Sequence, residues 1–348
     1  MNLKLHGTAA AILATFALAG CQGVSQEAAA PNTLVAAKVA QAPNPAALAS
    51  DPAWGQARPL NLELSDGANF GGTGQTTAML KAVYTADTLY MLVQYKDPTD
   101  SVRRGPYQKQ ADGSWKKLVA ASNKGGDETE FYEDKWAVIW PISNSIKGFE
   151  EQGCAVMCHE GQGKPFGNKY TSSPGELGDI WHVKGARTVP LGLGDDQYVD
   201  HTRYVKGVSN NAGRKNEDSQ GDYTQIKLVN GKPEFMNRDG KAANTGGGTY
   251  WIKPGEQVAF VDNFKPGDEV ASYVLNGLRA DRADLKVAQR WSNGVRTAVA
   301  SRKLVTGSKF DVQFDKPAAR YPFGFAAFDN AQVRHATNDD TLYLVFGK

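Results

Sequence analysis

The segment Cys154-Ala-Val-Met-Cys158-His159 places two thiols next to an imidazole. Covalent attachment of a haem uses this combination, because two cysteine thiols add to the two vinyl groups and the adjacent histidine ligates the iron. Three residues separate the cysteines instead of the usual two, and this wider spacing is a recognised variant of the attachment. The motif therefore predicts one haem c held by Cys154 and Cys158, with His159 as the proximal iron ligand.

Three other uses of the two cysteines remain open. In an exported protein they could form a small disulfide loop. A zinc or copper site is less favoured, because structural zinc sites have four protein ligands and the chain has no second pair of neighbouring cysteines. A redox-active dithiol is also less favoured, since such sites place Cys-x-x-Cys at the start of a helix. The adjacent His159 favours the haem, because a disulfide loop does not require a histidine there.

A six-coordinate haem needs a second axial ligand, and the mature chain offers His182, His201 and His335 besides His159. His335 follows the predicted strand at 323–328 and precedes the last predicted strand. A loop in that position could close over a haem edge. On this basis His335 is a candidate distal ligand, and His182 is another.

The surroundings of His182 suggest further haem contacts. Trp181 could stack on a porphyrin face, and Lys184 or Arg187 could pair with a propionate. The same residues are also typical of the end of an ordinary amphipathic strand. The adjacent acids at 195 and 196 could form a calcium or loop-stabilising site, but paired acids are usually solvated and we assign them no function.

The first residues predict export and lipid anchoring. Lys4 precedes an apolar run at 9–19 that is too short to span a bilayer, which is typical of a cleaved signal peptide over residues 1–20. Leu18-Ala-Gly-Cys21 resembles a bacterial lipobox, so Cys21 is the predicted acylation site, and an ordinary signal peptide is the alternative. The residue after this cysteine is Gln22 rather than Asp, and by the usual bacterial sorting rule this implies that the lipoprotein is located in the outer membrane. We expect a lipoprotein on the periplasmic side of the envelope, held by its acyl chains.

Composition predicts the remaining organisation. Residues 21–48 are rich in Ala, Pro, Gln, Ser and Val without a sustained period, which predicts a flexible, lipidated tether. Residues 49–348 would form the haem-binding domain. Without Lys4 the mature chain carries 38 basic side chains (39 less one) against 37 acidic ones. This balance argues against nucleic acid as a partner.

Alternating apolar residues predict a fold made mainly of strands. The pattern predicts a hairpin from 78–84 and 89–95, with further strands at 60–64, 135–142, 269–275, 294–304, 309–314, 323–328 and 341–346. At least eight strands and few helical periods favour an all-β, mainly antiparallel β-sandwich. Residues 191–262 are polar and rich in Gly, Asn and Asp, and they are expected to form a long, loop-rich insertion.

Several segments together resemble the haem-binding γ-subunit domain of ethylbenzene dehydrogenase and related periplasmic molybdenum enzymes. They are Asp51-Pro-Ala-Trp54, 89–97, 133–141, 153–159, 179–184, 302–307 and 323–328. The resemblance implies a β-sandwich similar to carbohydrate-binding and DOMON-like modules, with haem near one end. Those γ-subunits bind haem b through Met and Lys ligands, whereas the cysteine segment here implies a c-type branch. The family's distal ligand comes from near the carboxyl terminus, which favours His335 over His182.

These features predict a monohaem c-type cytochrome that transfers electrons in a respiratory chain, more an electron-transfer protein than an enzyme with its own substrate. Its redox partner would be a molybdenum oxidoreductase or another cytochrome, met transiently or held in a permanent complex. The rival prediction is a haem-free lipoprotein that captures a sugar or another ligand and carries a Cys154–Cys158 disulfide. Four tryptophans could supply its stacking faces, namely Trp54, Trp136, Trp140 and Trp251.

Overall fold

The computed structural model describes residues 30–123, 125–159, 168–206, 213–218 and 220–348. The predicted signal peptide, the predicted acylation site Cys21 and the start of the predicted tether lie outside these residues. Residues 31–348 belong to one unit of the fold. Within the described ranges, no helix is both long enough and apolar enough to cross a membrane.

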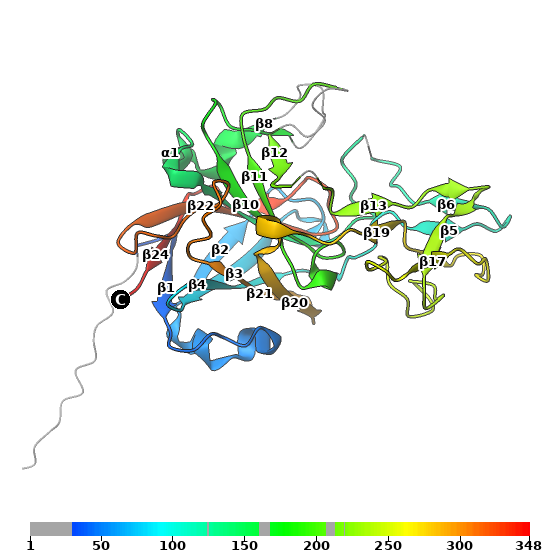
Figure 1. The fold of residues 1–348 in the computed structure, drawn as a ribbon, viewed down its shortest axis with the longest axis horizontal. Coiled ribbons are helices and arrows are strands. Elements are labelled where there is room, and N and C mark those ends of the chain that lie inside the picture. Colours follow the sequence, from blue (N-terminus) through cyan, green and yellow to red (C-terminus); the bar gives the residue numbers. More distant parts are fainter. Residues whose placement is uncertain (1–29, 124, 160–167, 207–212, 219) are drawn as a thin grey trace, which may run out of the picture. The chain divides into compact units, whose positions relative to one another are not determined.

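The largest sheet of the described chain contains thirteen strands (Figure 1). Along the sheet the order is β12 (Arg214–Asn216), β11 (Asp195–Val199), β10 (Gly178–Lys184), β7 (Lys135–Pro141), β22 (Arg320–Phe328), β24 (Leu342–Phe346), β1 (Thr33–Lys38), β3 (Thr76–Tyr84), β4 (Thr88–Lys96), β21 (Val295–Lys303) and β20 (Lys286–Ser292). Two more strands, β2 (Leu60–Leu64) and β23 (Ala336–Thr337), pair with β3 and β22. The pairs are antiparallel except those of β1, which runs parallel to β24 and β3.

The sheet folds over so that its two halves face each other. Strand β7 in one half contacts β4 and β20 in the other. The Tyr95 hydroxyl donates a hydrogen bond to the Lys135 carbonyl over 3.3 Å, and Trp136 Nε1 donates one to Gln289 Oε1 over 2.9 Å. Alternate side chains of both halves, such as the fully buried Trp181, form one apolar core between them. The predicted all-β, mainly antiparallel sandwich is confirmed.

Most predicted strands are present close to their predicted bounds. The hairpin is β3 and β4, with Ala78 opposite Tyr95 and Tyr84 opposite Leu89. Strands β2, β7, β21, β22 and β24 also match. The strand predicted at 269–275 is divided into β18 (Glu269–Val270) and β19 (Tyr273–Leu275), because the two parts pair with different neighbours.

The strand predicted at 309–314 is wrong, because this segment is a loop. Val312 is buried as the apolar pattern suggests. However, its N–H donates a hydrogen bond to Asp179 Oδ2 over 2.9 Å, and the Phe310 N–H donates one to Ser308 Oγ over 3.2 Å. Side chains thus satisfy backbone groups that would otherwise pair with a neighbouring strand.

The tether predicted at 21–48 needs correction in its second half. Strand β1 lies between β24 and β3, and its residues Leu34 and Ala36 are fully buried. The 3-10 helices η1 (Pro45–Ser50) and η2 (Pro52–Gln56) follow, and Trp54 Nε1 donates a hydrogen bond to the Leu48 carbonyl over 2.9 Å. A strand paired on both edges is an integral part of the sheet. In the sequence, only Leu34 and Ala36 alternate as core residues of β1. This pattern is too short to distinguish a strand from the alanine-rich residues around it.

The insertion predicted at about 191–262 holds more structure than its polar composition indicates. Strands β11 and β12 belong to the main sheet, while short pairs involve β5 (Tyr107–Lys109), β6 (Trp115–Lys117), β13 (Tyr223–Gln225), β14 (Leu228–Val229), β15 (Lys232–Pro233), β16 (Phe235–Asn237), β17 (Gln257–Ala259), β18 and β19. Apolar side chains of these strands and of the loops between them form a second core of Tyr107, Trp115, Ile226, Met236, Ala242, Ile252, Phe264, Val270 and Ala271. The insertion therefore folds together with residues from before and after it.

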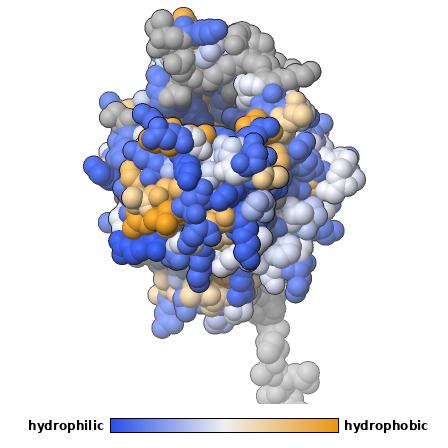
Figure 2. All heavy atoms as spheres, turned by 90° about the vertical axis from the view of Figure 1, so that its right-hand side faces the viewer, coloured by the Kyte–Doolittle hydropathy of each residue, from blue (hydrophilic) through white to orange (hydrophobic). Residues whose placement is uncertain are grey.

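These short strands lie together at the right of Figure 1, and Figure 2 views that side of the molecule. Its surface is mostly hydrophilic with small apolar patches (Figure 2). Leu228, Val229 and Val261 are among the exposed apolar side chains of these strands and loops. Scattered apolar side chains are normal on protein surfaces. Other short 3-10 helices are η3 (Phe70–Gly72), η4 (Ile142–Asn144), η6 (Val189–Leu191) and η7 (Ala280–Ala283).

Candidate functional site

A cavity of about 570 Å³ lies on the face of the sheet that is turned away from the sandwich core. This volume is within the range of roughly 300–1,000 Å³ that is usual for small-molecule sites. Its floor is formed by β7, β10 and β22. Because successive side chains of a strand point to opposite faces, Trp181 and Val183 enter the core while Ile180 and His182 line the cavity.

The centre of the floor carries small side chains. Gly324 and Ala326 of β22 lie opposite Ile139 and Ala137 of β7, and Ala137 in turn lies opposite His182 of β10. All five line the cavity. Because glycine and alanine have small side chains, they leave open space above the sheet. The His182 side chain lies beside this space.

A short helical segment brings Cys154 to this floor. Helix α1 (Phe149–Gln152) ends at Gly153, which has a positive φ of 61°, and the 3-10 helix η5 (Gly153–Met157) follows. Phe149 and Met157 are fully buried and anchor the segment. A Cβ atom on Gly324 would lie 2.9 Å from Cys154 Cβ and 3.0 Å from its Sγ. The close approach of Cys154 to the floor therefore requires glycine at position 324.

Both cysteines are free thiols. Cys154 packs on the floor, where burial raises the pKa of its thiol although the nearby Lys169 opposes the rise. Cys158 is exposed, and its Sγ lies 3.6 Å from the Cys154 carbonyl oxygen. The cavity therefore has one thiol against its floor and one open to solvent.

His159 lies in β8 (Cys158–His159), which pairs with β9 (Asn168–Lys169). Its ring stacks on Tyr170, with 3.7 Å between ring centroids and 8° between planes, and the Arg203 guanidinium lies 3.7 Å from the Tyr170 centroid. His159 Nε2 is buried and has no hydrogen-bond partner in the part of the chain that the structure describes. A buried polar atom without a partner costs about 1–3 kcal/mol, so a ligand for this nitrogen would be stabilising.

His182 also lines the cavity. Its Nδ1 lies 3.1 Å from Gln197 Oε1, and Arg214 Nη1 donates a hydrogen bond to that same oxygen over 2.8 Å. Because this oxygen accepts, His182 Nδ1 carries the proton and Nε2 carries the lone pair. His182 Nε2 is buried and has no hydrogen-bond partner among the described residues.

His335 lies on the loop between β22 and β23, as predicted, and it also lines the cavity. Its Nδ1 donates a hydrogen bond to the Val333 carbonyl over 2.9 Å, and its ring centroid lies 5.0 Å from that of Phe328. Burial lowers the pKa of His335 to about 4 and holds the pKa of His182 well below its usual value. Both imidazoles are therefore neutral near pH 7, which is the form that ligates metals.

Basic side chains that the sequence reasoning missed also line the cavity. Lys135, Lys169 and Arg214 are cavity residues. Lys135 is only 2% exposed; its Nζ donates a hydrogen bond to the Gln332 carbonyl over 2.8 Å and lies 4.1 Å from the Phe328 ring centroid. Within the described ranges no carboxylate forms an ion pair with Lys135, and burial lowers its pKa well below the usual value. An anion bound in the cavity could form an ion pair with Lys135. The sequence offers one sign that Lys135 is unusual: this charged residue directly precedes Trp136 in a strand that is otherwise apolar.

Trp181 does not line the cavity, so its predicted contact with a porphyrin needs correction. It is fully buried between the two halves of the sandwich, where its ring centroid lies 5.6 Å from that of Trp140 and 4.9 Å from the Arg302 guanidinium. The reason is the alternation along β10, which turns Trp181 and His182 to opposite faces of the sheet.

Lys184 and Arg187 also lie away from the cavity and already have acidic partners. Lys184 Nζ pairs with Asp195 and, over 2.9 Å, with Asp222. Arg187 pairs with Glu133 and, also over 2.9 Å, with Asp222. The prediction that these two side chains bind an anionic group therefore needs correction, because their charges are balanced inside the protein.

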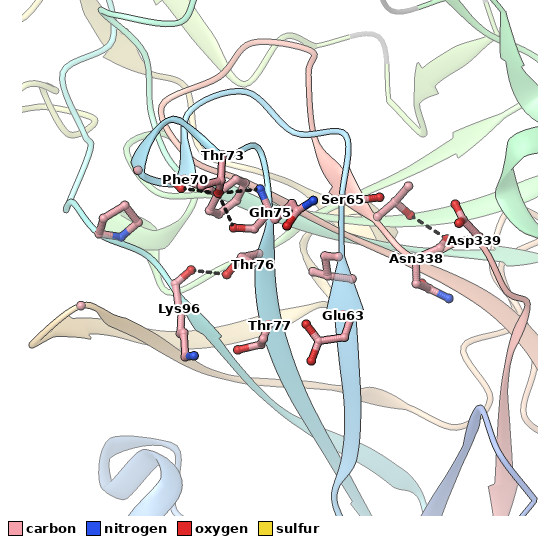
Figure 3. A pocket seen from close by; sticks show the side chains of 15 residues that line it. Glu63, Ser65, Phe70, Thr73, Gln75, Thr76, Thr77, Lys96, Asn338 and Asp339 are labelled. Atoms are coloured by element: carbon pink, nitrogen blue, oxygen red, sulfur yellow. Dashed lines mark hydrogen bonds between the residues drawn. The ribbon is translucent and has the colours of Figure 1, made fainter.

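A second cavity, of about 720 Å³, tests the rival prediction of a sugar-binding module. Figure 3 shows polar side chains such as Glu63, Thr77 and Lys96 around it. The one aromatic residue among its described lining residues is Phe70, which is only 5% exposed. Of the four tryptophans that could stack on a sugar, three are buried in the fold, namely Trp54, Trp136 and Trp140. The cavity lacks the exposed aromatic faces that the rival prediction relies on.

Comparisons with known proteins place the chain in a family. Residues 51–339 match the ethylbenzene dehydrogenase family. No curated protein matches the chain. One similar solved structure is a family 9 carbohydrate-binding module from Caldicellulosiruptor kristjanssonii in complex with glucose, which is 8% identical with a TM-score of 0.31 over 90% of this chain and 95% of that chain. Another, from Bacteroides uniformis and described as a carbohydrate-binding protein, is 9% identical with a TM-score of 0.36 over 90% of this chain and 99% of that chain.

The family match extends over most of the chain, from the residues before η2 to the loop that precedes β24. It includes the cysteine segment, the three strands of the cavity floor and the loop that carries His335. The chain belongs to the ethylbenzene dehydrogenase family.

Proposed function

We propose that this protein is a monohaem c-type cytochrome that transfers electrons, with the haem attached to Cys154 and Cys158 and ligated by His159. One observation carries the proposal: a single cavity collects both thiols and the imidazoles of His159, His182 and His335 from three segments far apart in the sequence. Membership of the ethylbenzene dehydrogenase family supports an oxidoreductase-related subunit.

The residues around the cavity fit a covalently held haem. The two thiols are free, and the buried His159 Nε2 has no hydrogen-bond partner among the described residues. When bound, the haem iron would supply one-electron redox chemistry. The chain would attach and ligate the group, partly shield it from water and balance its charge. The small residues of the floor provide space for a planar ring.

His335 is the proposed second axial ligand. The Val333 carbonyl holds its Nδ1 proton, which leaves Nε2 available, and ligating histidines commonly have such a backbone partner. His182 is the alternative, because Gln197 holds its Nδ1 in the same way and its Nε2 has no partner in the described chain.

Lys135 is the proposed partner of a haem propionate, in place of Lys184 and Arg187. It is buried beside the cavity without an acidic ion-pair partner among the described residues, whereas the other two already pair with Asp222. Lys169 and Arg214 add positive charge to the same lining. Charge-assisted pairing with a carboxylate would compensate the burial of the Lys135 ammonium.

The cellular setting belongs to the same proposal. Acylation of Cys21 would hold the protein on the periplasmic side of the envelope, in the outer membrane, with residues 22–32 as the tether. An exposed Cys158 at the cavity would leave one edge of the bound group close to solvent. A larger oxidoreductase or another cytochrome could exchange electrons at that edge. Family membership supports association with an oxidoreductase complex.

A pyridine haemochrome spectrum tests the proposed function. The full-length protein should be produced with a c-type maturation system and also run on a denaturing gel stained for haem. We expect about one haem per chain that stays with the polypeptide after denaturation. A colourless protein that folds normally and carries a Cys154–Cys158 disulfide would reject the cytochrome and favour the binding module.

Axial ligation predicts different spectra for two histidine variants. His335→Ala should change the ferric haem from a six-coordinate low-spin to a five-coordinate high-spin spectrum, because one ligand is removed. His182→Ala should keep the low-spin spectrum and serves as the matched control. If His182→Ala becomes high-spin and His335→Ala stays low-spin, His182 is the second axial ligand. If both variants stay low-spin, neither histidine is that ligand.

Removing the buried charge beside the haem should lower its reduction potential. Lys135→Gln keeps a long side chain but removes a positive charge that disfavours the ferric state, so we expect a decrease on the order of tens of millivolts. Lys241→Gln, at an exposed lysine outside the cavity lining, should change the potential little. Potentiometric titration followed by absorbance measures both. An unchanged potential in Lys135→Gln would place the propionates elsewhere.

A further inference from the structure

A second group of ionisable side chains lies on the opposite face of the same strands. Asp196 in β11 lies opposite Trp181 of β10 and therefore shares the core-facing side of the sheet with it and with Asp179. Asp311 comes from the loop after β21. The three are at most 1% exposed, and ligand oxygens of the three lie within 4.8 Å of one another. Asp195 and Asp196 are both fully buried, so the expectation of a solvated pair is wrong.

Arg302 is the basic side chain that pairs with this group in the described chain. Its Nη1 lies 2.7 Å from Asp179 Oδ2, 3.1 Å from Asp196 Oδ2 and 3.7 Å from Asp311 Oδ1. Its Nη2 donates a hydrogen bond to the Val312 carbonyl over 2.7 Å. One guanidinium thus holds one oxygen of each of two aspartates.

Two further acids lie next to this group. Asp284 interacts with Asp196, and Glu217 interacts with Asp311. Each has a buried carboxyl oxygen without a hydrogen-bond partner among the described residues. Five carboxyl groups are therefore clustered near Arg302.

Several of these carboxylate oxygens have no donor. Asp179 Oδ1, Asp196 Oδ1 and both oxygens of Asp311 are buried without a hydrogen-bond partner among the residues that the structure describes. Arg302 binds the Oδ2 atoms of the first two, so their other oxygens are the ones left over. Each buried oxygen without a donor is destabilising unless a ligand satisfies it.

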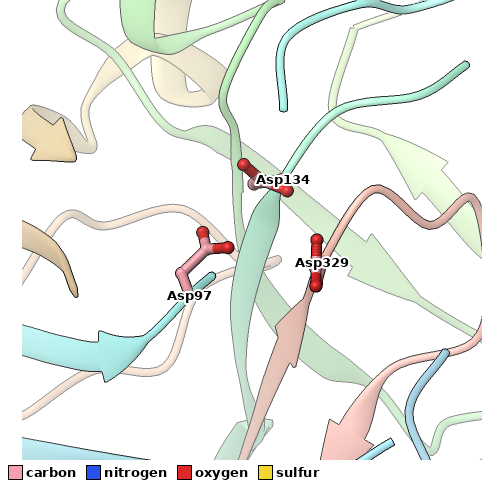
Figure 4. A group of neighbouring side chains, drawn as sticks. All are labelled: Asp97, Asp134 and Asp329. Atoms are coloured by element: carbon pink, nitrogen blue, oxygen red, sulfur yellow. The ribbon is translucent and has the colours of Figure 1, made fainter. Parts of the chain in front are cut away.

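In another group of buried aspartates, the buried carboxylate oxygens all have hydrogen-bond partners. Asp97, Asp134 and Asp329 lie close together in Figure 4, and Arg296 pairs with the first two. Backbone N–H groups and a threonine hydroxyl donate hydrogen bonds to their other oxygens. None of the three has an unpartnered buried oxygen in the described ranges. This group needs no additional cation, in contrast to that around Arg302.

We propose that Asp179, Asp196 and Asp311 bind a calcium ion, with Glu217 and Asp284 supplying further oxygen ligands. Calcium takes 6–8 oxygen ligands in flexible geometry, and carboxylates are its usual protein ligands. A site without nitrogen or sulfur donors favours such a hard cation over zinc or copper. The ion provides a partner for the carboxylate oxygens that lack a hydrogen-bond donor and ties β10, β11 and the loop after β21 together.

Calcium titration of the full-length protein tests this site directly. After treatment with a chelator, isothermal titration with calcium chloride should show about one ion bound per chain, and saturating calcium should raise Tm by roughly 5 °C. Absence of both effects, with higher stability in acid, would overturn the proposal and show that the carboxyl groups share protons instead. Calcium binding is measured without reference to haem, so this result is independent of the proposed electron transfer.

Variants locate the ion. Asp311→Asn should weaken calcium binding by at least roughly tenfold, because it removes a charged ligand that has no hydrogen-bond donor to lose. Asp329→Asn is the matched control in the satisfied group: it should lower Tm but keep calcium affinity. If Asp311→Asn does not fold, the half-buried Glu217→Gln replaces it and should also weaken binding. Wild-type affinity in the folded variant at the site would reject the assignment.

Discussion

Protein in which both Cys154 and Cys158 are replaced by serine is expected to lose covalent haem completely. Each thiol adds to one vinyl group, so either single variant should retain one thioether and still stain for haem on a denaturing gel. The structure places one thiol on the cavity floor and one open to solvent, and neither is engaged in a disulfide. Haem staining and absorbance of the three variants measure the effect.

Stability measurements separate loss of attachment from loss of folding. Cys158 is exposed, so its replacement should have little effect on the free energy of unfolding. Serine at the more buried position 154 should destabilise by about 1–3 kcal/mol, because its hydroxyl is placed beside the apolar floor. A double variant that folds and still carries covalent haem would contradict the assignment of both cysteines.

A second large effect is expected when Arg296 is replaced by methionine. Arg296 is only 3% exposed and pairs with the fully buried Asp97 and Asp134, the first over 2.8 Å. Removing one partner of a buried ion pair leaves uncompensated charge and costs about 3–5 kcal/mol. Urea denaturation near neutral pH should therefore show a large decrease in the midpoint. Arg290→Met, at an exposed residue of the neighbouring strand β20, should change stability by less than about 0.5 kcal/mol.

The defect of Arg296→Met should depend on pH. Burial raises the pKa of Asp97 to about 6 and that of Asp134 above its usual range, although Arg296 opposes both shifts. Without Arg296 both pKa values should rise further. A carboxyl whose pKa is raised on folding stabilises the fold at low pH and loses this contribution as pH rises through the folded value. The variant should thus be closer to wild type at about pH 5 than at about pH 8, and a defect independent of pH would reject this explanation.

The strands that sequence alone predicts are those whose pattern repeats several times. The strands β3 and β4 of the hairpin are nine residues long, and burial alternates along most of each strand, interrupted at Val83 and Leu92, which are also buried. This repeated pattern makes the register and the buried face readable. Strand β1 has only Leu34 and Ala36 as buried alternating residues, and its sheet neighbours are remote in sequence. Local patterns cannot reveal a strand that is stabilised mainly by distant partners.

The cavity shows a similar division between local and distant information. Cys154, Cys158 and His159 are adjacent, so their shared chemistry is visible in the sequence. Lys135 could not be assigned to them, because the pairing of β7 with β10 and β22 places it at the cavity. The wrong choices, Lys184 and Arg187, were near His182 in sequence, but Asp222 from the insertion neutralises them. Nearness to His182 in the sequence therefore did not predict which basic side chains are available to a ligand, because Asp222 from another segment pairs with both of them.

The alternation of β10 also separates two kinds of mutational consequence. Trp181 packs in the core and His182 faces the cavity, although they are neighbours in sequence. The same holds in β22, where Phe325 enters the core while Gly324 and Ala326 form the floor. Substitutions at floor positions such as His182 and Ala326, unlike Gly324, can therefore change which ligands and what volume the cavity offers while the packed interior stays intact. A lineage could exchange one ligand set for another by single steps here, without first passing through an unfolded protein.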